Sequence, residues 1–289
     1  KQKTAYEISL GLVGSEMCIR DRSLSWIEKA DPKKLAIIPI AGWIIGILIL
    51  LITQPWTENL GIAYSPARTA VLFAFTFTAC LSWAFYWAVL FAKRKEWLVP
   101  PGKYSPGIPV KIFSSWTYSS IGVIAATFIA AAVVGGAMRI DLAGLAIAAM
   151  APYFGAISVG IGMWIGEVIA YGPLAASTAW AVYPGIEIIA DALLDASIWV
   201  YASYVFFWVR ETNIYKRSRI AGILFAMLLF EPLHYGLWYI YWFIMNPWPS
   251  FVPIAIANFF GWALWAPILV FIGAMVGDQA YVIRLRPTE

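Results

Sequence analysis

The chain has 289 residues, of which 62% are hydrophobic and only 12% are charged, and its mean hydropathy is +0.75. A soluble domain carries roughly 25% charged residues. Because no aqueous fold can bury this much apolar surface, the composition excludes a soluble globular protein and predicts an all-α polytopic membrane protein. The formal net charge of +4 is spread over loops, and no nucleic-acid partner is needed to explain it.

Residues 1–22 resemble the translation of sequencing adapters. The stretch KQKTAYEI looks like a flow-cell primer, and LVGSEMCIRDR looks like a transposase adapter, a junction typical of an assembled metagenomic sequence. A signal peptide is excluded because Glu7, Glu16 and Arg20 interrupt any apolar stretch. We therefore expect residues 1–22 to be disordered and to pack against nothing.

Two apolar segments come before the clearest internal boundary of the chain. Residues 35–53 and 69–92 are long enough to cross a hydrocarbon core about 30 Å thick. The second segment ends in the basic run 93–95, which is typical of a cytoplasmic anchor. Residues 96–111 form a linker rich in proline and glycine. We therefore expect residues 23–111 to form an N-terminal two-helix membrane segment with its linker.

The remaining residues, 112–289, are expected to form a six-helix membrane core. Its predicted apolar segments cover residues 112–138, 142–172, 186–209, 220–245 and 251–276. The segment 142–172 combines small residues with Pro152 and Gly155, where a helix break is favoured. Gly162 and Gly166 have the four-residue spacing that lets two membrane helices approach backbone to backbone.

The basic residues indicate which ends of these segments share one side of the membrane. Cytoplasmic loops carry an excess of Lys and Arg. The clusters expected to be cytoplasmic are residues 29–34, 93–111, 210–219 and 284–286. This assignment requires residues 140–185 to cross the membrane an even number of times. We therefore divide 142–172 into two short spans near Pro152 and Gly155, giving eight helices with both termini cytoplasmic. The alternative is one kinked helix followed by a re-entrant segment at 174–183.

Three features of the core suggest a known family. The segment 112–138 carries Gly122, Ala126 and Ala130 on one face, at four-residue spacing. The glycine-rich stretch PYFGAISVGIGMWIGE follows, and then three long apolar segments and a basic C-terminus. In these features the core resembles the substrate-binding S component of energy-coupling factor (ECF) transporters.

The resemblance implies a non-enzymatic binding subunit in the cell (plasma) membrane. S components dock a coupling (T) subunit through a small-residue face on their first helix, and separate ATPase subunits power the import of a vitamin or similar nutrient. Gly122, Ala126 and Ala130 are the docking residues that the resemblance implies here. The alternative is that these small residues pack inside the protein's own bundle.

Ionisable residues inside apolar segments indicate functional sites, because a charge within the membrane is costly. Glu187, Asp191 and Asp195 are spaced by four and therefore line one face of a helix. They predict a pocket for a cationic or hydrogen-donating substrate, although partners on neighbouring helices or a water-filled vestibule would also explain them. Glu167 is expected either at a helix end facing water or in this pocket.

The next segment contributes Glu231 and His234. A di-metal site of the Glu-x-x-His type requires two such motifs, and the chain has one histidine, so we expect no metal site. Tryptophan is the best aromatic partner for a cation, and the aromatic residues nearest His234 are expected to stack a flat ligand. The other half of this aromatic stripe is expected to lie in the interfacial belt or the core. The expected substrate-binding residues are Glu187, Asp191, Asp195, Glu231, His234, Trp238, Asn258 and Trp262.

The sequence contains no motif of catalysis. A Walker A phosphate loop, a Gly-x-Ser-x-Gly elbow and a His-Glu-x-x-His motif are all missing, so neither enzymatic activity nor a cofactor is expected. One alternative is a self-contained secondary transporter or channel that uses Glu187, Asp191 and Asp195 as a cation path. A less favoured alternative is a membrane enzyme that holds magnesium between Asp191 and Asp195.

Overall fold

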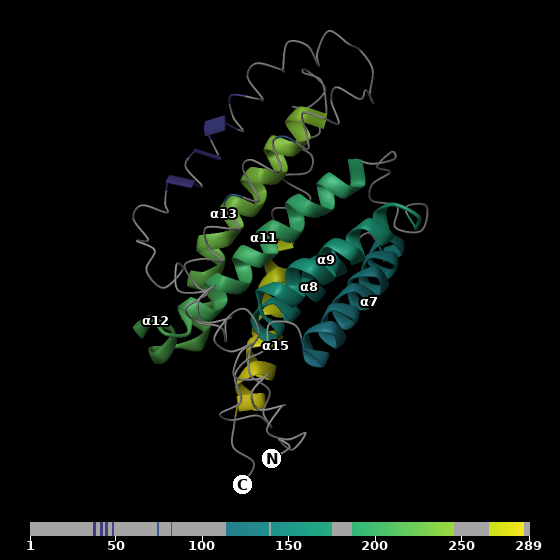
Figure 1. The fold of residues 1–289 in the computed structure, drawn as a ribbon. Helices are drawn as coiled ribbons and strands as arrows, with labels where there is room; N and C mark the ends of the chain where they lie inside the picture. The colour runs from purple at the N-terminus through teal and green to yellow at the C-terminus, as the bar shows by residue number, and fades with distance from the viewer. Residues whose placement is uncertain are drawn as a thin grey trace, which may run out of the picture.

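The computed structural model describes residues 114–138, 140–174, 187–245 and 266–285, with a few single residues between 37 and 82. Residues 1–22 and nearly all of the two predicted N-terminal spans lie outside the described residues. The described part is entirely helical, which confirms the predicted all-α class for it (Figure 1). Its helices are α7 (Ser115–Met138), α8 (Leu142–Phe154), α9 (Ala156–Tyr171), α11 (Glu187–Val209), α12 (Asn213–Arg217), α13 (Arg219–Met245) and α15 (Ala266–Leu285).

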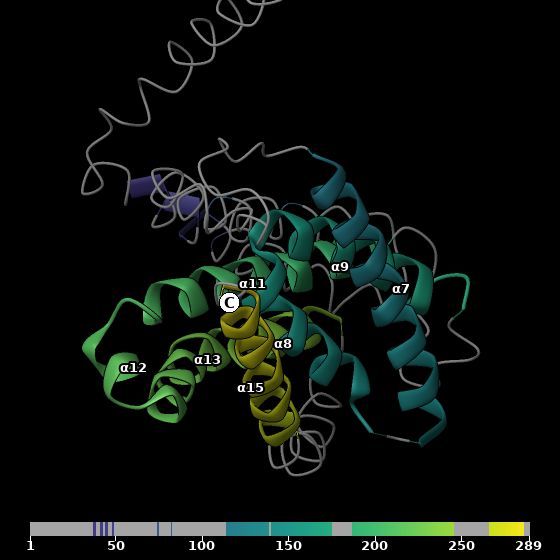
Figure 2. The ribbon, with the colours of Figure 1, turned by 90° about the horizontal axis from the view of Figure 1, so that it is seen from below.

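Three described helices, α7, α11 and α15, are long and apolar enough to cross a membrane. In α11, 83% of the apolar stretch is buried inside the protein, against 33% in α7 and in α15. The helix α11 is therefore the central one, and α7 and α15 expose most of their apolar surface. Figure 2 shows α7 at one edge of the bundle and α13 with the short α12 at the opposite edge.

Residues 142–172 form two helices, α8 and α9, separated only by Gly155. Gly155 has a φ of 88°, a backbone conformation that favours glycine because it has no Cβ. Pro152 lies inside the last turn of α8, where it lacks the N–H that would continue the helix. The predicted helix break near Pro152 and Gly155 is confirmed. With 13 and 16 residues, α8 and α9 are roughly 20 and 24 Å long.

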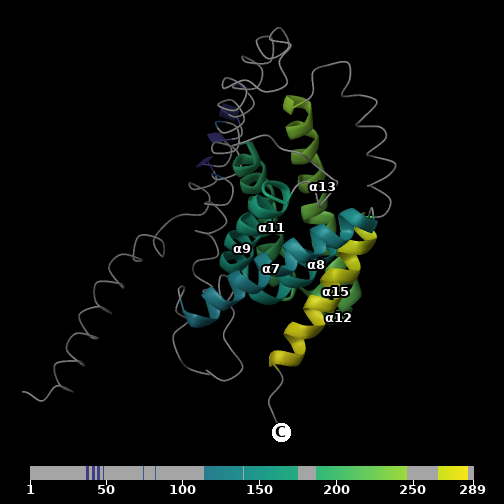
Figure 3. The same ribbon diagram turned by 90° about the vertical axis from the view of Figure 1, so that its right-hand side faces the viewer.

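Contacts between helix ends show the direction in which each helix runs. The Nη2 of Arg210, which follows α11, donates to the carbonyl oxygen of Pro152 at 2.7 Å. The ring of Trp116, near the start of α7, lies 5.8 Å from that of Phe154. The start of α7, the α8–α9 break and the end of α11 therefore lie at one end of the bundle, which we call the Arg210 end. The helix α8 runs toward this end and α9 runs away from it (Figure 3).

The helix α9 packs closely along α7, and the two run parallel. The hydroxyl groups of Ser120 and Ser158 lie 2.8 Å apart near the two N-termini. One turn further on, a Cβ added at Gly162 would lie 2.8 Å from the Cβ of Ile124. A Cβ added at Gly166 would lie 3.1 Å from the carbonyl oxygen of Ala125. Larger residues at these two positions would push the backbones of α7 and α9 apart.

A second glycine pair brings α15 against α8. Added Cβ atoms at Gly273 and Gly277 would overlap the carbonyl oxygens of Leu145 and Ala149, respectively. The contact residues increase in number by four along both helices, from Gly273 to Gly277 and from Leu145 to Ala149, so α15 and α8 also run parallel. The C-terminal part of α15 therefore reaches the Arg210 end. This pair was not predicted from the sequence, although its four-residue spacing is the same as that of Gly162 and Gly166.

Candidate functional site

The buried ionisable residues of α9, α11 and α13 meet inside the bundle. Their side chains are almost completely removed from the surface: the exposed fraction is 0% for Glu167 and Asp191 and 8% for Asp195 and Glu231. His234 of α13 is the fifth member, and its side chain is 15% exposed. We call these five residues the acidic cluster. It contains four carboxyl groups and a single imidazole.

In one half of the cluster, His234 lies between two carboxylates. Its Nδ1 is 3.1 Å from Oε2 of Glu231, and its Nε2 is 3.7 Å from Oδ1 of Asp195. The Nδ1–Glu231 distance is that of a hydrogen bond, whereas the longer Nε2–Asp195 distance is that of an ion pair if the ring is protonated. The indole of Trp199, which is 1% exposed, packs edge-on against the imidazole with ring centroids 5.7 Å apart. This half of the acidic cluster thus connects α11, through Asp195, to His234 of α13.

The other half of the cluster consists of carboxyl groups alone. Glu167 of α9 is completely buried within electrostatic reach of Asp191 and Asp195 of α11. Neither oxygen of Glu167 meets an N–H donor among the described residues. Of the two expected placements of Glu167, the structure excludes a helix end facing water and puts this residue in the cluster.

The remaining predicted pocket residues cannot be placed in this cluster. Glu187 is the first residue of α11 and Trp238 lies in α13, but both side chains are outside the described part. Asn258 and Trp262 lie wholly outside the described residues. The structure therefore brings together Asp191, Asp195, Glu231 and His234, and it adds Glu167. Among the described residues, no group of three or more His, Cys, Asp or Glu side chains is arranged to hold a metal ion.

The small-residue face of α7 points away from the described bundle. Gly122, Ala126 and Ala130 are all exposed, and a Cβ added at Gly122 would meet nothing within 4 Å. The opposite face of α7, with Ile124 and Phe128, packs into the core. Within the described residues, the alternative that the small residues pack inside the protein's own bundle therefore does not hold.

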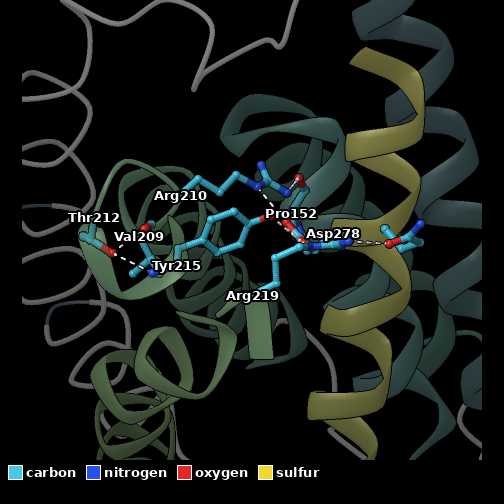
Figure 4. Close-up of polar contacts among 8 residues, drawn as sticks. Pro152, Val209, Arg210, Thr212, Tyr215, Arg219 and Asp278 are labelled. Atoms are coloured by element: carbon cyan, nitrogen blue, oxygen red, sulfur yellow. Dashed lines mark hydrogen bonds and ion pairs between the residues drawn. The ribbon is translucent and has the colours of Figure 1, made fainter. Parts of the chain in front are cut away.

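A second polar cluster lies at the Arg210 end, around Asp278 of α15 (Figure 4). Asp278 is 1% exposed and accepts hydrogen bonds from Arg210 Nε at 2.8 Å, Arg219 Nη2 at 2.6 Å and the hydroxyl of Tyr215 at 2.7 Å. The guanidinium of Arg210 also lies over the ring of Tyr281, 3.8 Å from its centroid. Burial raises the pKa of Tyr215, and the hydrogen bond to Asp278 raises it further.

This second cluster was not predicted from the sequence. Residues 210–219 were interpreted only as loop charges, whereas α12 lies within that stretch, and Arg210 and Arg219 bind Asp278. Asp278 was overlooked because the last span was predicted to end at residue 276. The helix α15 in fact continues to Leu285, so Asp278 is a charge inside a helix. A search for isolated carboxylates just beyond an apolar segment would have found it.

Comparison with models of known protein families, with curated proteins and with solved structures gives no match for this chain. The class of the protein therefore rests on its own sequence and geometry. The described part is a bundle of helices, three of them of membrane-spanning length and composition, with ionisable residues buried inside.

Proposed function

We propose that this chain is a membrane-embedded binding protein for a small, flat, cationic solute, acting as the substrate-binding subunit of an ECF-type importer. The observation that carries the proposal is the convergence of Asp195, Glu231 and His234 in one buried site. Among the described residues, the cluster brings four carboxyl groups and one imidazole together inside the bundle. A cationic or hydrogen-donating solute would pair favourably with such buried carboxyl groups.

The neighbouring groups also suit such a solute. Trp199 places an aromatic ring beside His234, and aromatic rings attract cations and stack on flat molecules. The central position of α11 puts Asp195 where it is surrounded by other helices, so that a bound solute would be shielded from lipid. Among the described residues, no nucleophile with an activating base belongs to this site, which favours binding over catalysis.

The exposed face of α7 supports the proposed partners. Gly122, Ala126 and Ala130 form a flat strip at which another helix can approach closely. In the proposal, the coupling (T) subunit docks on this strip in the plasma membrane, and separate ATPase subunits supply the energy. The chain itself would need neither a cofactor nor a nucleotide site.

The proposal is tested by native mass spectrometry of the full chain purified gently from a vitamin-rich host. We expect a small aromatic molecule to co-purify with the wild-type protein and to be lost from Asp195→Asn. The matched control is Glu211→Gln, which changes an exposed carboxylate and is expected to retain the molecule. A wild-type protein that is always empty and that carries out solute flux alone in liposomes would contradict the proposal.

The burial of Glu167 within electrostatic reach of Asp191 favours a second candidate function. A self-contained secondary transporter or channel would use such buried carboxyl groups as a path for protons or cations. It predicts flux driven by pH or voltage in liposomes that contain this chain and no ATPase subunit. Flux that requires added coupling and ATPase subunits would favour the importer instead.

A further inference from the structure

Two basic side chains that the proposed solute site does not use lie on the outer edge of the Arg210 end. The short helix α12 connects α11 to α13 there, and Figure 2 shows it at the edge of the bundle. Its last turn carries Lys216 and Arg217, and both residues are exposed. Neither side chain forms an ion pair or a hydrogen bond with another described residue. Both charges are therefore free to bind a partner.

The helix α12 is held firmly against the bundle. Thr212 caps its first turn, because the hydroxyl oxygen accepts a hydrogen bond from the N–H of Tyr215 at 3.4 Å. The ring of Tyr215 packs on Gly222 of α13, where an added Cβ would lie 2.6 Å from its Cδ2. The hydroxyl of Tyr215 donates to Asp278 of α15 at 2.7 Å (Figure 4). The inner face of α12 is thus fixed, and its basic last turn is exposed in a preformed arrangement.

The charges around α12 do not balance. Asp278 binds both Arg210 and Arg219, so two guanidinium groups share one carboxylate. Residues 210–219 contain four basic residues and one acidic residue, Glu211. With Asp278 included, two positive charges remain in excess at this edge of the described part. A partner that complements this surface carries negative charge.

Exposed apolar side chains begin directly beside these charges. Three residues at four-residue spacing line one face of α13 and are 54%, 47% and 72% exposed, respectively: Ile220, Leu224 and Leu228. Ile220 follows Arg217 by three residues, and Ile214 of α12 is 42% exposed. Trp208, two residues before Arg210, is 39% exposed, and exposed tryptophan is typical of the membrane–water interface. The surface therefore combines an apolar stripe with positive charge at its end.

We propose that α12 and the first turns of α13 form a binding surface for an anionic phospholipid. Lys216 and Arg217 bind the phosphate of the headgroup, and an acyl chain lies along the apolar stripe of α13. Basic residues beside a membrane surface attract anionic lipids, and charge-assisted hydrogen bonds to phosphate are strong. A lipid uses both the charges and the stripe, whereas a free phosphate ion uses only the charges. The surface is separate from the acidic cluster, so the proposal does not depend on the proposed function.

Native mass spectrometry of the full chain, titrated with phosphatidylglycerol or with neutral phosphatidylcholine, tests this surface. We expect the double variant Lys216→Gln/Arg217→Gln to bind phosphatidylglycerol about 30-fold more weakly than the wild-type protein, about fivefold for each charge removed. Binding of phosphatidylcholine is expected to be the same in both proteins. The matched control, Lys216→Arg/Arg217→Lys, keeps both charges and is expected to keep the wild-type affinity. Excess inorganic phosphate is expected to leave the lipid bound.

Equal affinity of the wild-type protein and the double glutamine variant for phosphatidylglycerol would overturn the proposal. Displacement of the lipid by inorganic phosphate would also overturn it, because the surface would then be a site for a soluble anion. If the glutamine variant does not fold, the wild-type protein decides the question. Its affinity for phosphatidylglycerol, but not for phosphatidylcholine, must fall as ionic strength rises, and binding that salt does not change contradicts the proposal.

Discussion

Asp278 is the acceptor for three side chains that come from different parts of the chain. Arg210 follows α11, Tyr215 belongs to α12, and Arg219 begins α13, while Asp278 itself lies in α15. Arg210 also donates to the carbonyl oxygen of Pro152, in the last turn of α8. A cation is favoured at that position, because the C-terminus of a helix carries a partial negative charge. One buried carboxylate thus ties together the ends of four elements.

We predict that Asp278→Asn lowers the free energy of unfolding by about 3 kcal/mol, the usual cost of removing one partner from a buried ion pair. Arg210 would lose its charge partner while its side chain stays 11% exposed. Chemical unfolding of the purified protein in detergent measures the change. Arg217→Gln, at an exposed position on α12, is the control and is expected to leave stability unchanged. Equal stability of the two variants would contradict a structural role for the cluster.

Tyr215 predicts how stability changes at alkaline pH. Burial and the hydrogen bond to Asp278 raise its pKa above 10.0, so the folded state holds the phenolic proton more tightly than the unfolded state. The stabilisation is fully present below the pKa of the unfolded state, near pH 10, and is lost as pH rises through the folded pKa. In Tyr215→Phe we expect a smaller drop in melting temperature between pH 9 and higher pH than in the wild-type protein. Parallel melting curves of the two proteins over that range would exclude this role.

At the scale of elements, the apolar segments predicted most helix boundaries well. Predicted segments 112–138, 186–209 and 220–245 correspond to α7, α11 and α13, because charged or polar residues flank each apolar run. The end of α15 was misplaced because Asp278 looked like the start of a loop. The position of Glu167 within electrostatic reach of Asp191 was also beyond prediction. Helical periodicity places residues on one helix, but it does not say which helices are neighbours.

The two kinds of glycine in the helices predict opposite outcomes for the same substitution. A Cβ at Gly277 would overlap the carbonyl oxygen of Ala149, whereas a Cβ at Gly122 would meet nothing within 4 Å. We expect Gly277→Ala to cost about 1–3 kcal/mol of stability through overpacking. Gly122→Ala is expected to be neutral or stabilising by up to about 1 kcal/mol, since alanine favours helix. Unfolding in detergent compares them, and similar losses in both variants would refute the close packing of α15 on α8.

At the scale of the whole molecule, the positions of the helix ends bear on the predicted topology. The charge distribution requires an even number of crossings between residues 140 and 185. The structure places α8 and α9 in opposite directions, with their junction next to Arg210. That arrangement is the one that the proposed topology requires, in which α8 and α9 cross separately and Arg210 and Arg219 face the cytoplasm.

Cysteine labelling of intact cells decides between these two topologies. Ile140, Leu174 and Ser218 are all exposed, and each can be changed to cysteine after Cys18 and Cys80 are replaced by serine. We expect a membrane-impermeant maleimide to label Ile140→Cys and Leu174→Cys in intact cells, and Ser218→Cys only after permeabilisation. A single long helix over 142–172 would instead put the first two positions on opposite sides. Labelling of only one of them from outside would therefore refute the α8–α9 hairpin as a membrane-crossing pair.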